Sequence, residues 1–266
     1  MKPANFGIVF AMLFISLFVV RDHGTKALQE VATQRLVYNN CLDSAIEDAM
    51  TEIVEVDMGR QIMLNQQEVI NEFFTALAVN FDAMENPEKK EFLKAYVPAI
   101  VFIERKKATI YYDFLNGGSC YEVLFQKIQG DYRITFTLND YVYVESMETG
   151  EVLEGDFHDV GQVFSIELLQ QEDWFYEEQK KTIHDVLLEH LETIIEEHND
   201  RVKKLGIKYR FFLPTIEKEE WYRGIDEVSM MVFFQGYPYG NNTIGYYNRM
   251  AIGGAEIKKE REIRIE

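Results

Sequence analysis

The residues that most resemble a metal site are histidines in a long helical pattern over residues 171–204. Zinc proteases place two histidines four residues apart on one helix, so that both rings reach the same ion. Here His184, His190 and His198 are separated by six and by eight residues, and such spacings do not bring two rings to one ion. The pattern favours solvent-facing histidines on an acidic helix. We expect no metal site and no other cofactor.

The common catalytic motifs are also missing from the sequence. It contains no G-x-S-x-G turn, no P-loop and no G-x-G-x-x-G dinucleotide motif. A glycosidase needs two carboxylates at a set separation across a cleft, and nothing singles out one pair among 45 acidic residues. We therefore predict a protein that is not an enzyme, and an enzyme is the least favoured class.

The most distinctive loop reads YPYGNNT over residues 237–243. Aromatic rings supply rigid contact area, while Gly and Asn supply adaptable hydrogen bonds. One interpretation is a hairpin turn whose tyrosines pack on a sheet. The other is a partner contact made by Tyr237, Tyr239, Asn241 and Asn242.

The chain has two cysteines, Cys41 in a helical pattern and Cys120 at the start of a strand pattern. They lack the paired C-x-x-C spacing of a zinc site. In an exported protein they are a candidate disulfide. The alternative is two free thiols that behave as small apolar side chains.

The N-terminal segment indicates whether the protein is attached to a membrane. Residues 3–20 carry no charge and lie between Lys2 and Arg21. As a helix, 18 residues rise roughly 27 Å, close to the roughly 30 Å hydrocarbon core of a bilayer. We predict a retained transmembrane anchor with its flanks over residues 1–25. A cleaved signal peptide and a buried core helix are the alternatives.

An amphipathic stalk helix is predicted over residues 26–60. Apolar residues recur there at spacings of three and four, opposite a charged face. The narrow stripe formed by Leu42, Ile46, Ala49 and Ile53 is called the helix seam below. A lone helix cannot bury it, so either the head of the same chain or a neighbouring chain must cover it. We expect both along its length.

Residues 61–266 are predicted to form an α+β head, in which helices cover one face of an antiparallel sheet. Apolar periodicity predicts helices over residues 66–83, 87–96 and 171–204. Strand-forming residues separated by turn residues predict strands over residues 99–104, 109–115, 121–128, 132–138, 141–147, 207–213, 228–234, 244–252 and 255–265.

The net charge of the chain limits the kinds of molecule that it can bind. The chain has 27 basic and 45 acidic residues, a net charge of −18. So acidic a chain is a poor match for a phosphate backbone, and we exclude nucleic acid as a partner. Asp22 is the only acidic residue before residue 27, so the acidic charge lies beyond the apolar segment. An anionic cytoplasmic leaflet would repel it, which favours a bulk of the chain outside the cytoplasm.

The apolar stretch Phe6–Val20, followed by the helical sequence NNCLDSAIEDA over residues 39–49, resembles pilins and pseudopilins. It is also similar to the membrane-anchored accessory proteins of tight-adherence pilus systems. The resemblance implies an anchored helix that carries an α+β head. We therefore expect a single-pass, surface-exposed structural protein of a bacterial envelope assembly, such as a pilus or secretion apparatus. Its partners would be the membrane and other envelope proteins or copies of itself. An anchored extracellular module that binds a ligand or glycan is the alternative.

Overall fold

The computed structural model describes residues 3–51, 65–213, 229–240 and 245–254. Within the helices and strands, the side chains of residues 3–9, 11, 19, 20, 23, 51 and 254 lie outside this description. The predicted strand over residues 255–265 also lies outside it.

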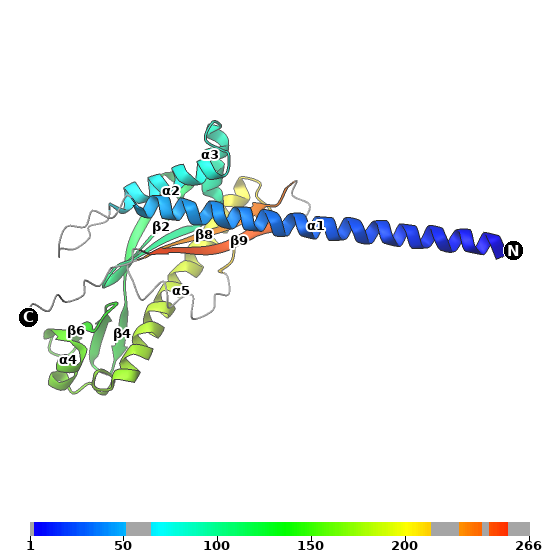
Figure 1. The fold of residues 1–266 in the computed structure, drawn as a ribbon. Helices are drawn as coiled ribbons and strands as arrows, with labels where there is room; N and C mark the ends of the chain where they lie inside the picture. Colours follow the sequence, from blue (N-terminus) through cyan, green and yellow to red (C-terminus); the bar gives the residue numbers. More distant parts are fainter. Residues whose placement is uncertain (1–2, 52–64, 214–228, 241–244, 255–266) are drawn as a thin grey trace, which may run out of the picture.

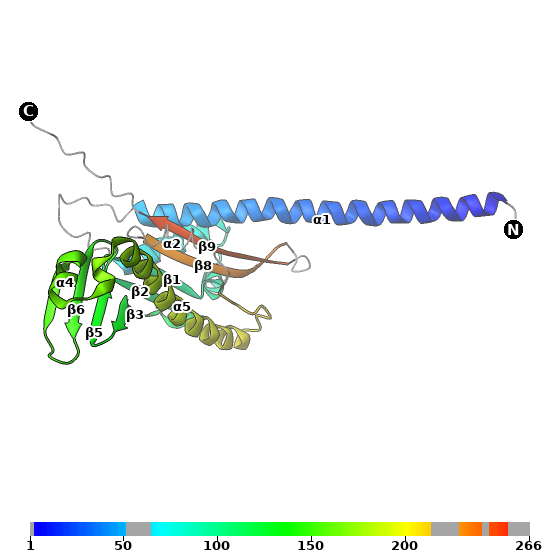
Figure 2. The ribbon, with the colours of Figure 1, turned by 90° about the horizontal axis from the view of Figure 1, so that it is seen from below.

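The first helix, α1 (Pro3–Thr51), runs without a break through the segments predicted as anchor and stalk. Its N-terminal part projects from the head as a single arm in both ribbon views (Figures 1 and 2). Gly24 lies inside the continuous helix, and nothing approaches within 4 Å of where its Cβ would be. Across the residues that the structure describes, no helix combines the length and the apolar character needed to span a membrane.

Two short helices follow, and each begins at an asparagine. The Asn65 side chain accepts a hydrogen bond from the backbone of Glu68 and so caps α2 (Gln66–Asn80). Asn86 caps α3 (Pro87–Leu93) in the same way, and Pro87 occupies the first turn, where its missing N–H costs nothing. A 3₁₀ turn, η1 (Lys94–Tyr96), completes the predicted third helix.

The strands form two antiparallel sheets. The larger sheet has the order β3-β2-β1-β8-β9 and the smaller one the order β4-β5-β6-β7. The larger sheet comprises β1 (Ala99–Ile103), β2 (Lys107–Tyr112), β3 (Ser119–Leu124), β8 (Ser229–Pro238) and β9 (Tyr246–Gly254). The smaller sheet comprises β4 (Gln126–Gln129), β5 (Tyr132–Phe136), β6 (Tyr141–Ser146) and β7 (Val152–Asp156).

The remaining helices follow the smaller sheet and complete an α+β fold. They are α4 (Phe157–Phe164), the 3₁₀ turn η3 (Glu167–Gln170) and the long α5 (Glu172–Lys204). A further 3₁₀ turn, η2 (Phe114–Asn116), follows β2. The smaller sheet and α4 lie at the end of the head that is remote from the N-terminus (Figures 1 and 2).

Helices cover both faces of the larger sheet, so the prediction of a single covered face is wrong. On β1, Ile100 and Phe102 face a core shared with α1 and α2, whereas Val101 and Ile103 face a core shared with α5 and the smaller sheet. All five residues of β1 are buried. A strand buried on both faces is the centre of a three-layer packing rather than of a half-exposed sheet.

Three segments differ from the predicted strands. The strand predicted over residues 121–128 divides at Phe125, where the chain passes from one sheet to the other. Neither β7 nor α4 was predicted. Residues 207–213 form no regular strand, because side chains bind their backbone in place of a neighbouring strand. Asn199 binds the N–H and C=O of Phe211, and Gln235 binds those of Phe212.

The helix seam lies within the head's own core. Leu42, Ile46 and Ala49 are all buried in the cluster that includes α2 and β9, so this part of the stripe is covered by the same chain. Ile53 lies outside the described residues. Beside this stripe, Arg249 of β9 forms an ion pair with Asp43 at 2.8 Å, which fixes α1 along the sheet edge.

Gly253 permits the close approach of β9 to α1. A Cβ at this position would lie 2.3 Å from Cγ2 of Ile46, a branched side chain that is itself buried. We expect Gly253→Ala to lower the free energy of unfolding by about 1–3 kcal/mol, measured by denaturant titration. Gly24→Ala is the matched control. Nothing surrounds that position, so the change should be neutral or stabilise by about 1 kcal/mol through helix propensity. An unchanged stability of the Gly253 variant would contradict this packing.

Candidate functional site

A half-open basin of about 320 Å³ lies between α2, α3 and the turn after β2. From α2 come Gln67, Ile70, Asn71, Phe74 and Thr75. The opposite wall is made by Lys90, Glu91 and Lys94, and the end wall by Tyr111, Phe114, Gly117 and Gly118. We call this site the basin. Its size lies at the lower end of the range for small-molecule sites.

The floor of the basin is apolar and its rim is polar. Ile70, Phe74 and Phe114 are buried, and the rings of Phe74 and Phe114 meet edge to face at 5.0 Å. On the rim, both carboxylate oxygens of Glu91 accept hydrogen bonds from Lys94 Nζ, at 2.8 and 2.9 Å. Lys90 is half-buried and forms no ion pair with any residue that the structure describes. Among the residues that the structure describes, the basin therefore offers one positive charge, Lys90, with no carboxylate paired to it.

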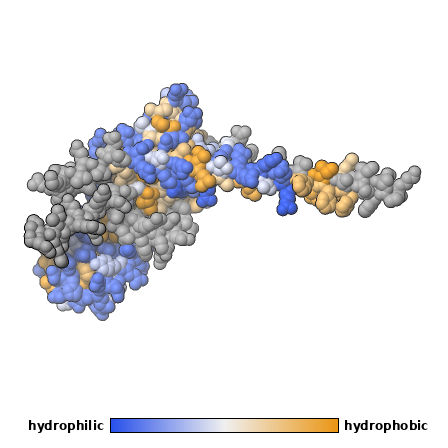
Figure 3. Space-filling view, viewed as in Figure 1, coloured by the Kyte–Doolittle hydropathy of each residue, from blue (hydrophilic) through white to orange (hydrophobic). Residues whose placement is uncertain are grey.

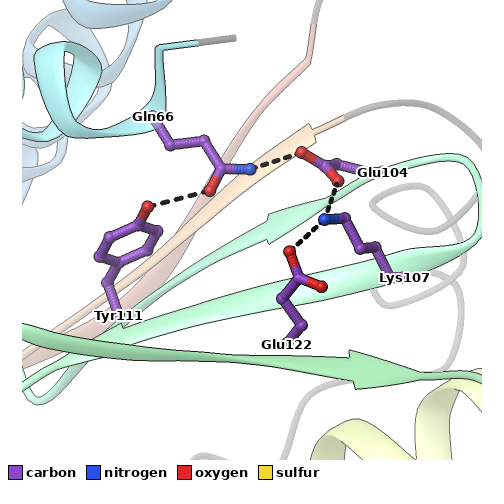
Figure 4. Close-up of polar contacts among 5 residues, drawn as sticks. All are labelled: Gln66, Glu104, Lys107, Tyr111 and Glu122. Carbon is purple, nitrogen blue, oxygen red and sulfur yellow. Dashed lines mark hydrogen bonds and ion pairs between the residues drawn. The ribbon is translucent and has the colours of Figure 1, made fainter. Parts of the chain in front are cut away.

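A polar network holds Tyr111 at the end wall (Figure 4). Its hydroxyl donates to Oε1 of Gln66 at 3.1 Å, and Nε2 of Gln66 donates to Oε1 of Glu104 at 2.6 Å. Lys107, the first residue of β2, forms ion pairs with Glu104, which follows β1, and with Glu122 of β3. Both hydrogen bonds to Glu122 and Glu104 raise the pKa of Lys107, which keeps it charged. The network ties the start of α2 to β2 and β3.

The last turns of α5 brace two walls of the basin. Nε2–H of His198 donates to the carbonyl of Ala95 at 2.9 Å and so holds η1, the 3₁₀ turn that begins at the wall residue Lys94. Nε of Arg201 lies 3.7 Å from Oδ1 of Asp113. Asp113 has a left-handed backbone, and its carbonyl accepts from the N–H groups of Asn116 and Gly118 at 3.0 Å each. α5 therefore fixes the turn that closes the basin.

Burial perturbs the titration of the bracing histidine. The His198 side chain is only 2% exposed, and desolvation lowers its pKa from 6.5 to about 4. The Arg201 guanidinium lowers the pKa further, while the hydrogen bond to Ala95 and the charge of Asp113 oppose the shift. The ring is therefore neutral at pH 7 and acts as a hydrogen-bond donor to the backbone.

The helix does not present its histidines to solvent as predicted. His198 is buried, and His190 is half-buried with its Nδ1 at 3.1 Å from the hydroxyl of Tyr121. Burial raises the pKa of Tyr121 to about 12, and Tyr112 and the charge of Glu197 add to the shift. His184 lies beside Asp185. Among the described residues, no group of three or more His, Cys, Asp or Glu side chains is placed to hold a metal ion.

The tyrosines of the distinctive loop pack inward. Tyr239 is only 6% exposed, and its ring lies parallel to that of Tyr38 on α1 at 5.7 Å. Tyr237 meets the same ring edge to face at 5.3 Å, and burial raises the pKa of its hydroxyl to about 12. These two residues therefore hold α1 against the hairpin instead of forming an exposed contact surface. Asn241 and Asn242 lie outside the described residues.

The candidate disulfide is not formed in this structure. Cys41 and Cys120 are free thiols, on α1 and on the outermost strand β3 respectively. Cys41 Sγ lies 3.3 Å from the carbonyl oxygen of Asn80, which anchors α1 to the end of α2. Burial raises the pKa of the Cys41 thiol. Cys120 is exposed.

Sequence reasoning did not find the basin, although part of its signal is visible. Gln67, Asn71 and Thr75 recur every four residues on the polar face of a predicted helix, and Lys90 and Lys94 repeat the same spacing. The spacing of these residues does not show that the polar face of the predicted helix and the two lysines meet at the turn after β2.

Comparison with known proteins gave no match. No protein-family model matches the chain, and neither a curated protein nor a solved structure matches it.

Proposed function

We propose that this protein is a membrane-anchored structural component of a bacterial envelope assembly, such as a pilus or secretion apparatus. One observation carries the proposal. The C-terminal half of α1 is locked into the head, while its N-terminal half extends away as a single helix with large apolar side chains exposed, among them Phe14, Leu17 and Phe18. Phe18 is 75% exposed.

A lipid bilayer is the environment that best accounts for the exposed apolar side chains of this arm. Apolar side chains gather on the outer part of the arm, and polar ones follow nearer the head (Figure 3). Each fully exposed Leu or Phe forgoes about 1.5–3 kcal/mol of burial free energy. The uncharged residues 3–20 are long enough to reach across a hydrocarbon core if they are inserted as a helix.

Between the uncharged stretch and the head lies a polar spacer. Residues 21–30 include the Asp22–Lys26 ion pair at 2.6 Å, and Val31 packs against the head. Ten helical residues rise roughly 15 Å, so the head would stand about that far from the bilayer surface. A continuous helix makes this spacer stiff. One continuous helix that joins the apolar arm to the head supports the proposal of an anchored head.

The acidic head favours placement outside the cytoplasm, and the exposed thiol of Cys120 allows a direct test. In intact cells, a membrane-impermeant maleimide should label the full-length protein, and Cys120→Ser should abolish the labelling. Labelling that appears only after the cells are broken would contradict this orientation.

Membrane extraction tests the anchor itself. Full-length protein should stay in the membrane pellet after alkaline carbonate washing. Phe14→Asp with Leu17→Asp should move it to the soluble fraction, because each charge at a bilayer centre costs about 3 kcal/mol. The matched control replaces two exposed residues of the same helix nearer the head, Gln29→Asp with Thr33→Asp, and should stay in the pellet. Uncleaved full-length protein in the soluble fraction would refute the anchor.

The basin supports a second candidate function, an anchored extracellular module that binds a ligand or glycan. Its polar rim, apolar floor and braced walls are the features expected of a small-molecule site.

A further inference from the structure

The lining of the basin carries a net positive charge, whereas the chain as a whole is strongly negative. Among its lining residues, Lys90 and Lys94 are basic and only Glu91 is acidic, in a chain whose net charge is −18. Glu91 is engaged by Lys94 through both oxygens, which leaves Lys90 to act on a ligand. The complement of a single ammonium beside a polar rim is one carboxylate.

The facing wall is a ladder of uncharged hydrogen-bonding groups. Gln67, Asn71 and Thr75 follow one another at successive turns of α2, roughly 5–6 Å apart. Gln67 Nε2 and Asn71 Oδ1 are 3.4 Å apart, so the two amides lie side by side. Amides and hydroxyls both donate and accept, as the hydroxyl groups of a sugar ring do.

The floor between the two walls suits the apolar face of such a ring. Phe74 and Phe114 form it with Ile70. Because Arg201 and Asp113 hold the end turn and His198 holds η1, the walls are fixed before a ligand arrives. A fixed site lowers the ordering cost of binding. A volume of about 320 Å³ accepts one ring and little more.

We infer that the basin binds an acidic saccharide unit, a hydroxyl-rich ring that carries one carboxylate. The carboxylate pairs with Lys90, the ring hydroxyls bind the amide ladder, and the C–H face of the ring lies on the phenylalanine floor. This inference rests on the second candidate function and names its ligand class.

Ligand-observed saturation-transfer NMR tests it on full-length protein in a zwitterionic detergent that carries no sugar. The probes are D-glucuronate, D-glucose, which lacks the carboxylate, and acetate, which lacks the ring. D-glucuronate should bind with a dissociation constant at or below the millimolar range. Lys90→Gln should weaken its binding about tenfold or more, and Asn71→Leu should also weaken it. Lys208→Gln, an exposed lysine outside the basin, should change nothing.

Melting temperatures of the three variants serve as the folding control, since Asn71 and Lys208 are exposed and Lys90 is only half-buried. Equal binding of glucose or of acetate would overturn the inference while leaving a ligand-binding head in place. Unchanged glucuronate binding by Lys90→Gln would overturn it as well. Failure of all three probes would overturn the inference without bearing on membrane extraction, which does not involve the basin.

Discussion

Replacing Leu42 with Asp is expected to unfold the head. Leu42 is 0% exposed and packs within the core shared by α1, α2 and β9. Loss of a buried leucine side chain costs about 2–5 kcal/mol, and desolvation of an unpaired carboxylate adds several more. Domains of this size are typically stable by about 5–15 kcal/mol in total. Thermal unfolding followed by circular dichroism should show the cooperative transition lost or strongly lowered.

Leu36→Asp is the matched control on the same helix, because Leu36 is 64% exposed. It should change the free energy of unfolding by no more than about 0.5 kcal/mol. If neighbouring copies bundle through the exposed face of α1, crosslinked oligomers of the full-length protein should disappear with Leu36→Asp while its melting temperature is kept. A Leu42→Asp protein that melts like the wild type would show that the core assignment of α1 is wrong.

The contrast between Leu42 and Leu36 also shows what can be predicted from the spacing of apolar residues along a helix. The spacing of Leu42, Ile46 and Ala49 predicts one apolar face, and the structure buries that face. The sequence does not say what covers it, since α2 and β9 are brought there by contacts distant in the chain. In the same way, local pattern gave the long helices and most strands but not their arrangement in two sheets with helices on both faces of one.

The segments whose secondary structure was predicted wrongly have sequences that do not specify it locally. β7 reads VLEGD, with little strand propensity, and it exists because it pairs with β6. Residues 207–213 have strand-like composition, yet Asn199 and Gln235 take up backbone groups that a neighbouring strand would have bound. Tertiary contacts decide both cases.

The candidate site could likewise not be predicted from local sequence pattern. The walls of the basin come from four segments between Gln67 and Gly118, and no short motif marks them. The bracing role of Arg201 on Asp113 depends on the packing of α5 against one face of the larger sheet, which the sequence does not specify. The loop over residues 237–243 is the most distinctive one in the sequence, yet Tyr237 and Tyr239 pack against Tyr38.

Acidification is expected to destabilise the head through His198. In the unfolded chain this side chain binds a proton near pH 6.5, whereas burial lowers its folded pKa to about 4. Between these values the unfolded state binds more protons, so the free energy of unfolding falls as the pH falls. The stabilisation is complete above about pH 6.5 and is lost progressively towards pH 4. The difference corresponds to roughly 3 kcal/mol.

His198→Gln removes the titrating group, so the variant should be less stable than wild type at pH 7 and should lose less stability on acidification. Urea unfolding at several pH values between 7 and 4 measures the difference between the two proteins, in which the common contribution of the carboxylates cancels. His158→Gln is the control, since His158 is exposed on α4. It should reproduce the wild-type slope. If His198→Gln showed the same slope as wild type, His198 would be accessible to protons in the folded head, and its bond to Ala95 would not brace the basin.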